Sequence, residues 1–398
     1  MHKVHKIALD PNDRQATALA RAAGCARFAY NWALARWNEL YEAHKADPSQ
    51  PKPNQLALRR ELNAIKRERF PWMLDVTKCA PQEAVINLGK AFANFFAGRA
   101  KRPVFKKRGI HDSFKCSAGT FKVFENRIQL PVIGTLRMRE PLRHPDAKLV
   151  SVTVSRTADR WFASIAVEVP NDAPASPPDG GTIGVDAGTR EFVLSNGERH
   201  EVPRALRKAQ RQLRRAQKAL SRRKRGSRNR EKARRRVARI HARAANVRAD
   251  WLHKLSDRLT KTFSIVGVET LNVRGMVKNR HLSKSIMDAA FAEFRRQCDY
   301  KAAWRGGRIV VAGTFFPSSK ICSACGAKTK RLPLGRRSWV CESCGTRHDR
   351  DLNAAINLEQ LAVSSTVPAC GEFFASGVSG SPDTPCGLDE AGTKHRCA

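Results

Sequence analysis

Two pairs of cysteines constrain the fold of this chain more than any other feature of its sequence. Both pairs have the Cys-x2-Cys spacing and fifteen residues separate them: Cys322, Cys325, Cys341 and Cys344. This pattern is typical of structural zinc sites, in which two tight turns each present two thiolates to a tetrahedral Zn²⁺. A glycine after each pair, Gly326 and Gly345, suits the backbone of such turns. We therefore expect one structural Zn²⁺ in a ribbon over residues 316–347, with all four positions taken by protein.

The other cysteines do not indicate disulfides. The total of eleven is odd, and the remaining seven are scattered singly, as expected of small buried or tail residues in a reducing compartment. The chain has no apolar run of about 18 residues that could cross a bilayer, and Met1-His2-Lys3-Val4 lacks the apolar core of a secretory signal. We expect a cytosolic protein without a membrane partner.

The charge indicates a polyanionic partner. The chain has 74 Lys and Arg against 36 Asp and Glu, a net charge of +38. Residues 204–248 hold 20 Lys or Arg and a single acid, Glu231, and so supply half of that net charge. Solvated helix faces normally mix charges of both signs, so this stretch favours contact with nucleic-acid phosphates.

The same basic stretch has a helical apolar pattern. Small and aliphatic residues step by three and four from Leu206 to Leu220 and again from Val237 to Trp251, with Gly226-Ser227 between the two runs. This pattern predicts two antiparallel helices that pack along a narrow seam. Basic residues near the turn and in the second helix are the expected nucleic-acid contacts: Arg222, Arg223, Lys224, Arg225, Arg234, Arg235 and Arg236.

The first part of the chain reads as strands around a helical insert. Residues 3–9 are predicted to form a short strand. The sequence pattern is then helical to about Ala97, with a loop over residues 46–54. Short alternating apolar runs between about 117 and 170 predict antiparallel strands in a small barrel. We expect one lobe over residues 1–170, with strands at about 1–10 and 117–170 and the insert at about 11–116.

A Pro/Gly/Asp/Ala linker over residues 170–181 precedes a second unit. Apolar strands are predicted at 183–187, 191–195, 263–268 and 308–316, with a helix at about 284–304. They indicate an α/β domain over residues 182–315, with the basic hairpin at 204–262 as an insert. A last helix belongs to residues 348–362, and the Ser/Gly/Pro-rich residues 363–398 read as a disordered tail.

Three carboxylates fall where a metal-dependent nuclease would need them. Asp186 lies in an apolar strand, Glu269 ends a later strand, and Asp351 begins the last helix. A ribonuclease-H-like fold gathers acids in this order to hold two Mg²⁺ about 4 Å apart. Each also has an ordinary interpretation: Asp186 could be a turn residue, Glu269 a solvated strand end, and Asp351 a favourable charge in a first helical turn. His348 and Asp349 could likewise be cap residues.

Several segments together resemble the TnpB (OrfB) family of insertion-sequence proteins, which is related to the type V CRISPR effector nucleases. The resemblance rests most on two motifs around the cysteines, Phe316-Pro-Ser-Ser-Lys320-Ile-Cys322 and His348-Asp-Arg-Asp351-Leu-Asn353-Ala-Ala-Ile-Asn357. Other matching segments cover most of the chain: Gly24-Cys-Ala-Arg27-Phe28-Ala-Tyr30-Asn31-Trp32, Ala91-Phe-Ala-Asn-Phe-Phe96, Ile128-Gln-Leu-Pro-Val-Ile-Gly134, Val152-Thr-Val-Ser-Arg156, Gly184-Val-Asp186-Ala-Gly188, Ser221-Arg-Arg-Lys-Arg-Gly226 and Val268-Glu269-Thr-Leu271.

The resemblance implies a multidomain α+β protein. Its N-terminal β-barrel would be the wedge domain, joined to a helical recognition bundle, and a RuvC-like α/β nuclease domain with an inserted zinc ribbon would follow. It also implies an RNA-guided DNA endonuclease. A guide RNA from the transposon end would pair with double-stranded target DNA beside a short flanking motif, with one protein per guide RNA.

Carried over to this chain, the nuclease triad and magnesium ligands are Asp186, Glu269 and Asp351, with Asp349 as the alternative to Asp351. Cys322, Cys325, Cys341 and Cys344 correspond to the ligands of the structural zinc. Three alternatives stay open at this stage: a nuclease-silent RNA-guided repressor, a strand-joining transposase, and a non-specific RNA chaperone. The intact set of three acids argues against the repressor, and a chaperone would need neither the acids nor the ribbon.

Overall fold

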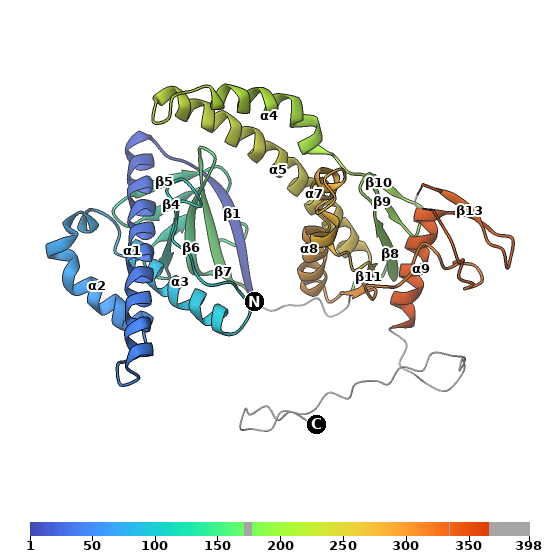
Figure 1. Ribbon diagram of the computed structural model, residues 1–398, viewed down its shortest axis with the longest axis horizontal. Helices are drawn as coiled ribbons and strands as arrows, with labels where there is room; N and C mark the ends of the chain where they lie inside the picture. The colour runs from blue at the N-terminus through green and yellow to red at the C-terminus, as the bar shows by residue number, and fades with distance from the viewer. Residues whose placement is uncertain (171–176, 334, 366–398) are drawn as a thin grey trace.

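The chain forms two lobes with a helical hairpin across them (Figure 1). A computed structural model describes residues 1–170, 177–333 and 335–365. The N-terminal lobe contains residues 1–170, and the C-terminal lobe begins with the strand that carries Asp186. No helix in these ranges combines the length and the apolar character needed to span a membrane.

Helices cover one side of the N-terminal lobe. The longest, α1 (Asp13–Ala46), begins at a capping box in which Asn12 and Gln15 satisfy each other's backbone N–H groups. Its buried face is rich in alanine, which lets the chain pack closely against α3. Trp37 of α1 stacks on Phe92 of α3, with ring centroids 4.2 Å apart. The other helices of this lobe are α2 (Gln55–Arg69), η1 (Pro71–Asp75) and α3 (Cys79–Phe96).

Seven strands form the sheet of the N-terminal lobe, in the order β2-β6-β7-β1-β5-β4-β3. All their pairings are antiparallel, and none of those described joins β2 to β3, so closure into a barrel stays a prediction. The strands are β1 (His2–Asp10), β2 (Ser113–Ser117), β3 (Lys122–Phe124), β4 (Arg127–Leu130), β5 (Gly134–Met138), β6 (Lys148–Thr157) and β7 (Arg160–Glu168).

The expected helical insert over residues 11–116 was too long. Its last helix, α3, ends at Phe96, and β2 already begins at Ser113. The strand has an alternating pattern in which Phe114 and Cys116 are buried, but it is only five residues long. A run this short, next to a Lys/Arg-rich loop, has too few apolar side chains for periodicity to identify it.

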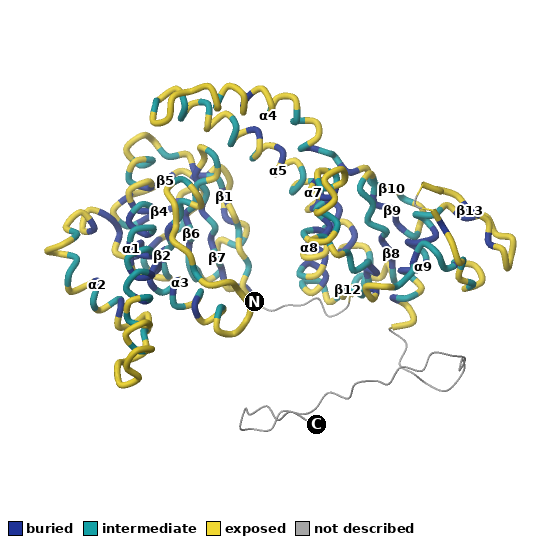
Figure 2. The backbone as a smooth tube through the Cα atoms, in the orientation of Figure 1, coloured by how far each residue is buried: buried dark blue, intermediate teal, exposed yellow. Residues whose placement is uncertain are grey.

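The basic hairpin consists of α4 (Ala205–Ser221) and α5 (Arg228–Thr262), as predicted. Figure 2 shows its first helix, α4, as largely exposed. Ala216, Ile240 and Ala244 are buried in the seam, whereas Val247, also predicted there, is 43% exposed. The second helix continues into the C-terminal lobe, where Leu252 and Leu259 lie in its core.

The C-terminal lobe is built on a five-stranded sheet in the order β10-β9-β8-β11-β12. The central strand β8 is parallel to β11 and antiparallel to β9, and β11 is also parallel to β12. The strands are β8 (Thr182–Ala187), β9 (Glu191–Leu194), β10 (Arg199–Glu201), β11 (Ile265–Val268) and β12 (Arg308–Val311).

The structure of this lobe differs from the prediction in three places. The strand expected over 308–316 ends at Val311, because the chain turns where the Phe316 N–H donates to the Gly313 carbonyl. The helix expected over 284–304 is divided into α7 (Ser283–Ala289) and α8 (Phe291–Trp304) by Ala290, which has a φ of +51°. A short helix, α6 (Val273–Met276), was not predicted.

The last helix, α9 (Arg350–Ser364), lies directly on the sheet. Glycines allow this contact: a Cβ on Gly184 of β8 would lie 1.9 Å from the Ala355 carbonyl oxygen, and one on Gly267 of β11 would lie 2.4 Å from that of Leu358. The helix starts two residues later and ends two residues later than predicted. Residues 363 and 364, expected in the tail, therefore belong to the helix, and residues 366–398 of the expected tail lie outside the described residues.

Candidate metal centres and nucleic-acid interface

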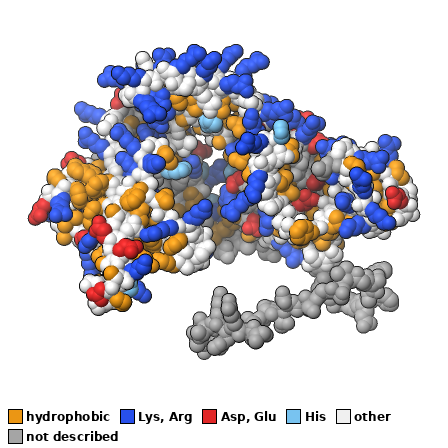
Figure 3. All heavy atoms as spheres, in the orientation of Figure 1, with side chains coloured by type: hydrophobic (Ala, Val, Ile, Leu, Met, Phe, Trp, Pro, Cys, Tyr) orange, Lys and Arg blue, Asp and Glu red, His pale blue; other side chains and the backbone are white. Residues whose placement is uncertain are grey.

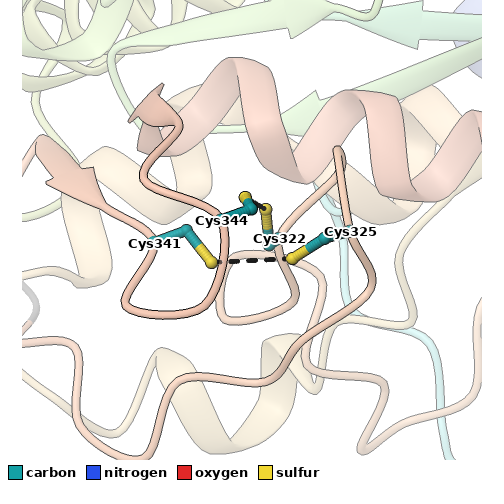
Figure 4. Close-up of side chains that lie close together, drawn as sticks. All are labelled: Cys322, Cys325, Cys341 and Cys344. Carbon is teal, nitrogen blue, oxygen red and sulfur yellow. Dashed lines mark hydrogen bonds between the residues drawn. The ribbon is translucent and has the colours of Figure 1, made fainter.

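The four predicted zinc ligands come together (Figure 4). Among the described residues they form the one group of three or more Cys, His or acidic residues whose ligand atoms all lie within 4.8 Å of one another. The Sγ atoms of Cys322 and Cys344 are 3.6 Å apart, as are those of Cys325 and Cys341. A tetrahedral Zn²⁺ with bonds of about 2.3 Å separates its sulfur ligands by about 3.8 Å, so the cluster fits zinc.

Each cysteine pair lies in the same kind of turn. The N–H of Gly326 donates to the Cys322 carbonyl at 2.8 Å, and that of Gly345 donates to the Cys341 carbonyl at 2.9 Å. Both glycines have a positive φ, +75° and +73°, which side chains rarely adopt. The antiparallel strands β13 (Ser338–Val340) and β14 (Arg347–Asp349) flank the second turn, and β14 leads directly into α9.

The electrostatics of the cluster favour a cation. Hydrogen bonds with Thr346 lower the pKa of Cys344 to about 6. The Ala327 backbone N–H lowers the pKa of Cys325, but the neighbouring sulfurs of Cys344, Cys322 and Cys341 raise it to about 12. Thiolates this close together repel one another, and a bound metal ion would remove this conflict.

His348 is a contact of the zinc cluster that the sequence did not reveal. Its Nε2 lies 3.0 Å from the Cys322 Sγ, and its buried ring packs against Trp339 with centroids 4.8 Å apart. The sequence had suggested a helix cap for this residue. Its neighbour Asp349 does cap α9, since Asp349 Oδ1 accepts from the N–H groups of Asp351 and Leu352 at 3.1 and 2.9 Å.

The three predicted acids lie near one another. Asp186 is in β8, Glu269 directly follows β11, and Asp351 is in the first turn of α9, which packs on both strands. Burial and the nearby charges of Glu269 and Asp351, in that order, raise the pKa of Asp186 well above its usual range. An ion that neutralised these charges would reverse this shift, so the donor set fits hard divalent cations, although it is not as compact as the cysteine cluster.

Each of the other two acids has a partner that the sequence did not identify. The Ser318 hydroxyl donates to Glu269 Oε1. The Arg337 guanidinium, on the loop between the cysteine pairs, donates to Asp351 at 3.1 and 3.3 Å. Ser318 lies within a motif that the sequence singled out, whereas nothing marked Arg337 among the other basic residues of its loop.

Asp351 is the better placed of the two candidates for the third acid. Asp349 uses Oδ1 to cap α9 and to pair with Arg199, 3.1 Å away. After burial, Glu269 and Asp351 are the two acids whose charges raise the pKa of Asp186 most.

A groove lies between the basic hairpin and the N-terminal lobe. The groove has a volume of about 770 Å³ and is lined by Lys6 and the β6–β7 turn on one side and by α5 on the other. Arg239 of α5 pairs with Asp159 across it, which ties the hairpin to the N-terminal lobe. Lys and Arg side chains cover the hairpin and gather around the hollow beneath it (Figure 3).

All seven predicted contact residues of the hairpin are exposed. Two of them already have an acidic partner: Arg234 and Arg235 pair with Glu231 at 2.7 and 3.2 Å. These bonds, that from Arg234 first, lower the pKa of Glu231 to about 2. Around the turn, Arg230 donates to the Leu220 and Arg223 carbonyls and closes the end of the hairpin.

Three family models match successive parts of the chain. A helix-turn-helix domain of OrfB proteins matches residues 1–46, a family described as a probable transposase (OrfB_IS605) matches residues 164–280, and the Cas12f1-like TNB domain matches residues 291–358. The last match contains the four cysteines and Asp351.

Relatives match nearly the whole chain. A protein of Streptomyces pristinaespiralis named "Putative RNA-guided DNA endonuclease" is 38% identical over 93% of this chain and 91% of its own length. The protein InsQ of Escherichia coli K12, with the same description, is 34% identical over 94% of each chain. A Mycobacterium tuberculosis protein so described is 33% identical over 89% of this chain and 85% of its own.

One solved structure is similar in fold. The cryo-EM structure of the Cas12f1-sgRNA-target DNA complex contains a chain that matches with a TM-score of 0.52 at 15% identity, over 85% of this chain and 81% of that one. At this identity the match supports the fold alone. The order of elements, two lobes with the cysteine ribbon near the end, is therefore that of a known architecture.

Proposed function

This chain belongs to the TnpB (OrfB) family of RNA-guided DNA endonucleases, and from this premise we propose that it cuts DNA at the carboxylates Asp186, Glu269 and Asp351. A guide RNA from the transposon end would select double-stranded DNA next to a short flanking motif. One protein would bind one guide RNA. The observation that carries the proposal is the proximity of Glu269 and Asp351 to the half-buried Asp186, whose pKa burial and their two charges raise.

The sheet supports a ribonuclease-H-like, or RuvC-like, nuclease domain. An antiparallel β10-β9-β8 run continues into the parallel pairs β8–β11 and β11–β12, with α9 on one face. This arrangement places Asp186 and Glu269 toward the carboxyl ends of adjacent parallel strands and the first turn of α9 beside them. The three acids would hold two Mg²⁺. Such a pair activates a water molecule and stabilises the leaving oxygen of a phosphodiester.

The residues of the chain have separable tasks in this scheme. Asp186, Glu269 and Asp351 would hold the ions, which would supply the charge that orients the scissile phosphate. The exposed arginines and lysines of the hairpin and the groove beneath it neutralise the phosphates of the guide–target duplex, which predicts strong salt dependence of binding. The four-cysteine cluster holds one Zn²⁺, which fixes the ribbon that follows β12.

The test begins with the RNA that co-purifies with the protein expressed from its native locus. A discrete species whose 3′ end matches neighbouring DNA supplies the guide for a cleavage assay on a plasmid with the matching target. We expect breaks with wild-type protein and none with Asp186→Ala, while RNA binding is unchanged.

Other outcomes would favour other functions. Guide-dependent binding without breaks would indicate a repressor, and joined products at the ends of the element would indicate a transposase. A heterogeneous mixture of cellular RNA would contradict guidance and leave a non-specific RNA-binding protein.

A further inference from the structure

Ser318 joins the start of the zinc ribbon to an acid of the nuclease site. Its side chain is 4% exposed and lies in the short segment between β12 and Cys322. Its hydroxyl donates to Glu269 Oε1. Because Glu269 follows the last residue of β11, its side chain is not held by the strand itself, and a hydroxyl bond restricts where its oxygens can lie.

Two buried amides of α9 hold the backbone of this segment. The Asn357 Nδ2 donates to the carbonyls of Ser318 and Ile321, both at 2.7 Å. The Asn353 Nδ2 donates to the Ile321 carbonyl at 2.7 Å and lies 3.4 Å from that of Ser318. Both amides are at most 3% exposed, so each lost bond would leave a buried polar group unpaired.

The same amides reach the first cysteine turn. The Ser323 N–H, adjacent to Cys322, donates to Asn353 Oδ1 at 2.9 Å. Hydrogen bonds therefore connect the zinc ligand turn, through α9 and the Ser318 backbone, to the carboxylate of Glu269. The helix that makes this connection also carries Asp351.

We propose that Ser318 is a positioning residue for Glu269, and that the zinc ribbon sets the affinity of the carboxylate site for its divalent cations through Ser318. The hydroxyl fixes one carboxylate oxygen so that the acid enters the site in one orientation. The ribbon, held on α9 by Asn353 and Asn357, fixes the hydroxyl. This inference rests on the proposed nuclease function.

The test measures metal affinity directly and then in the reaction. Mn²⁺ serves as the probe, and its binding to the full zinc-loaded chain is followed by the EPR signal of the free ion, with Asp186→Ala as the background. We expect Ser318→Ala to weaken Asp186-dependent Mn²⁺ binding by roughly 3- to 10-fold, the net effect of losing one typical intramolecular hydrogen bond. It should raise the Mg²⁺ concentration for half-maximal cleavage by the same factor.

The neighbouring serine provides the matched control. The structure records no side-chain hydrogen bond for Ser319 among the described residues, so Ser319→Ala should bind Mn²⁺ like the wild type. Asn357→Leu should weaken Mn²⁺ binding in the same direction as Ser318→Ala, although Asn357 touches no acid of the site. Zinc content and melting temperature are measured for every variant, so that a folding defect is seen separately.

Two results would overturn the proposal. In the first, the Mn²⁺ affinity of Ser318→Ala and the Mg²⁺ concentration that it needs for half-maximal cleavage are within twofold of the values for Ser319→Ala. In the second, the wild-type protein shows no Asp186-dependent Mn²⁺ binding. A wild-type protein that binds Mn²⁺ at Asp186 but does not cut guided targets would instead contradict the nuclease function. In that case the binding comparison still decides the role of Ser318.

Discussion

The contact between α9 and the sheet gives the sharpest prediction. In Gly184→Ala the new Cβ would lie 1.9 Å from the Ala355 carbonyl oxygen and 2.6 Å from the Glu359 nitrogen. Both are backbone atoms, so no side chain can rotate away. To reach an ordinary contact of at least 3.4 Å, α9 and β8 must separate by roughly 1.5 Å, and overpacking of this kind costs about 1–3 kcal/mol or more.

The same displacement should affect activity more than stability. Ala355 lies one helical turn after Asp351, so a shift of the helix moves this acid away from Asp186. A misplacement of about 1 Å in a reaction centre can reduce the rate about 100-fold. We therefore expect Gly184→Ala to lower the midpoint of chemical unfolding and to reduce the single-turnover cleavage rate by about two orders of magnitude.

A second glycine serves as the control. A Cβ on Gly24, inside α1, would meet no atom within 4 Å, so Gly24→Ala should stabilise the protein by about 0.5–1 kcal/mol without changing cleavage. Gly184→Ala with wild-type stability and wild-type cleavage rate would refute the argument that α9 rests on the sheet at this point and positions Asp351.

Three further predictions concern single side chains. Cys322→Ser should reduce bound zinc well below one per chain, measured by atomic absorption, and a stoichiometry still near one would contradict the four-thiolate site. Because the pKa of Asp186 is raised, the native state keeps the proton of this carboxyl at pH values where the unfolded chain has lost it, so Asp186 destabilises the metal-free protein as the pH rises above about 4. Asp186→Asn should therefore raise the melting temperature of the metal-free protein at pH 7.5 and have no effect near pH 4. An unchanged melting temperature at pH 7.5 would contradict the raised pKa. Asp288 is buried and accepts from the Leu206 and Arg207 N–H groups at 3.0 and 3.1 Å, so Asp288→Ala should lower the free energy of urea unfolding by about 1–2 kcal/mol. The control Asp250→Ala, which removes only an exposed ion pair with Lys254, should lower it by at most about 0.5 kcal/mol.

The sequence predicted the parts of the fold that depend on periodicity or on local spacing. The predicted cysteine turns and basic hairpin were confirmed, because the residues that determine each of them lie close together in the sequence. The positions of Asp186, Glu269 and Asp351 followed from their order along strands and a helix.

The parts that were missed depend on tertiary contacts. Ala290 adopts a positive φ without being glycine, which no local signal predicts, and α7 ends there with Asp288 turned toward α4. The hydrogen bonds of Ser318 and Arg337 to the acids arise only when the ribbon folds back on α9. Sequence patterns identified the segment that holds Ser318 but not the atom it would bind.

The continuity of α5 limits how this architecture can change length. Its 35 residues run without interruption from the basic turn into the core of the second lobe, over about 50 Å. A helix turns about 100° per residue, so deletion of one residue between Ile240 and Leu252 would swing the arginines at the far end a quarter turn around the axis and draw them back by about 1.5 Å. Relatives or engineered variants with a longer or shorter α5 should therefore gain or lose seven or eleven residues here, because these lengths nearly preserve the direction in which the basic side chains point.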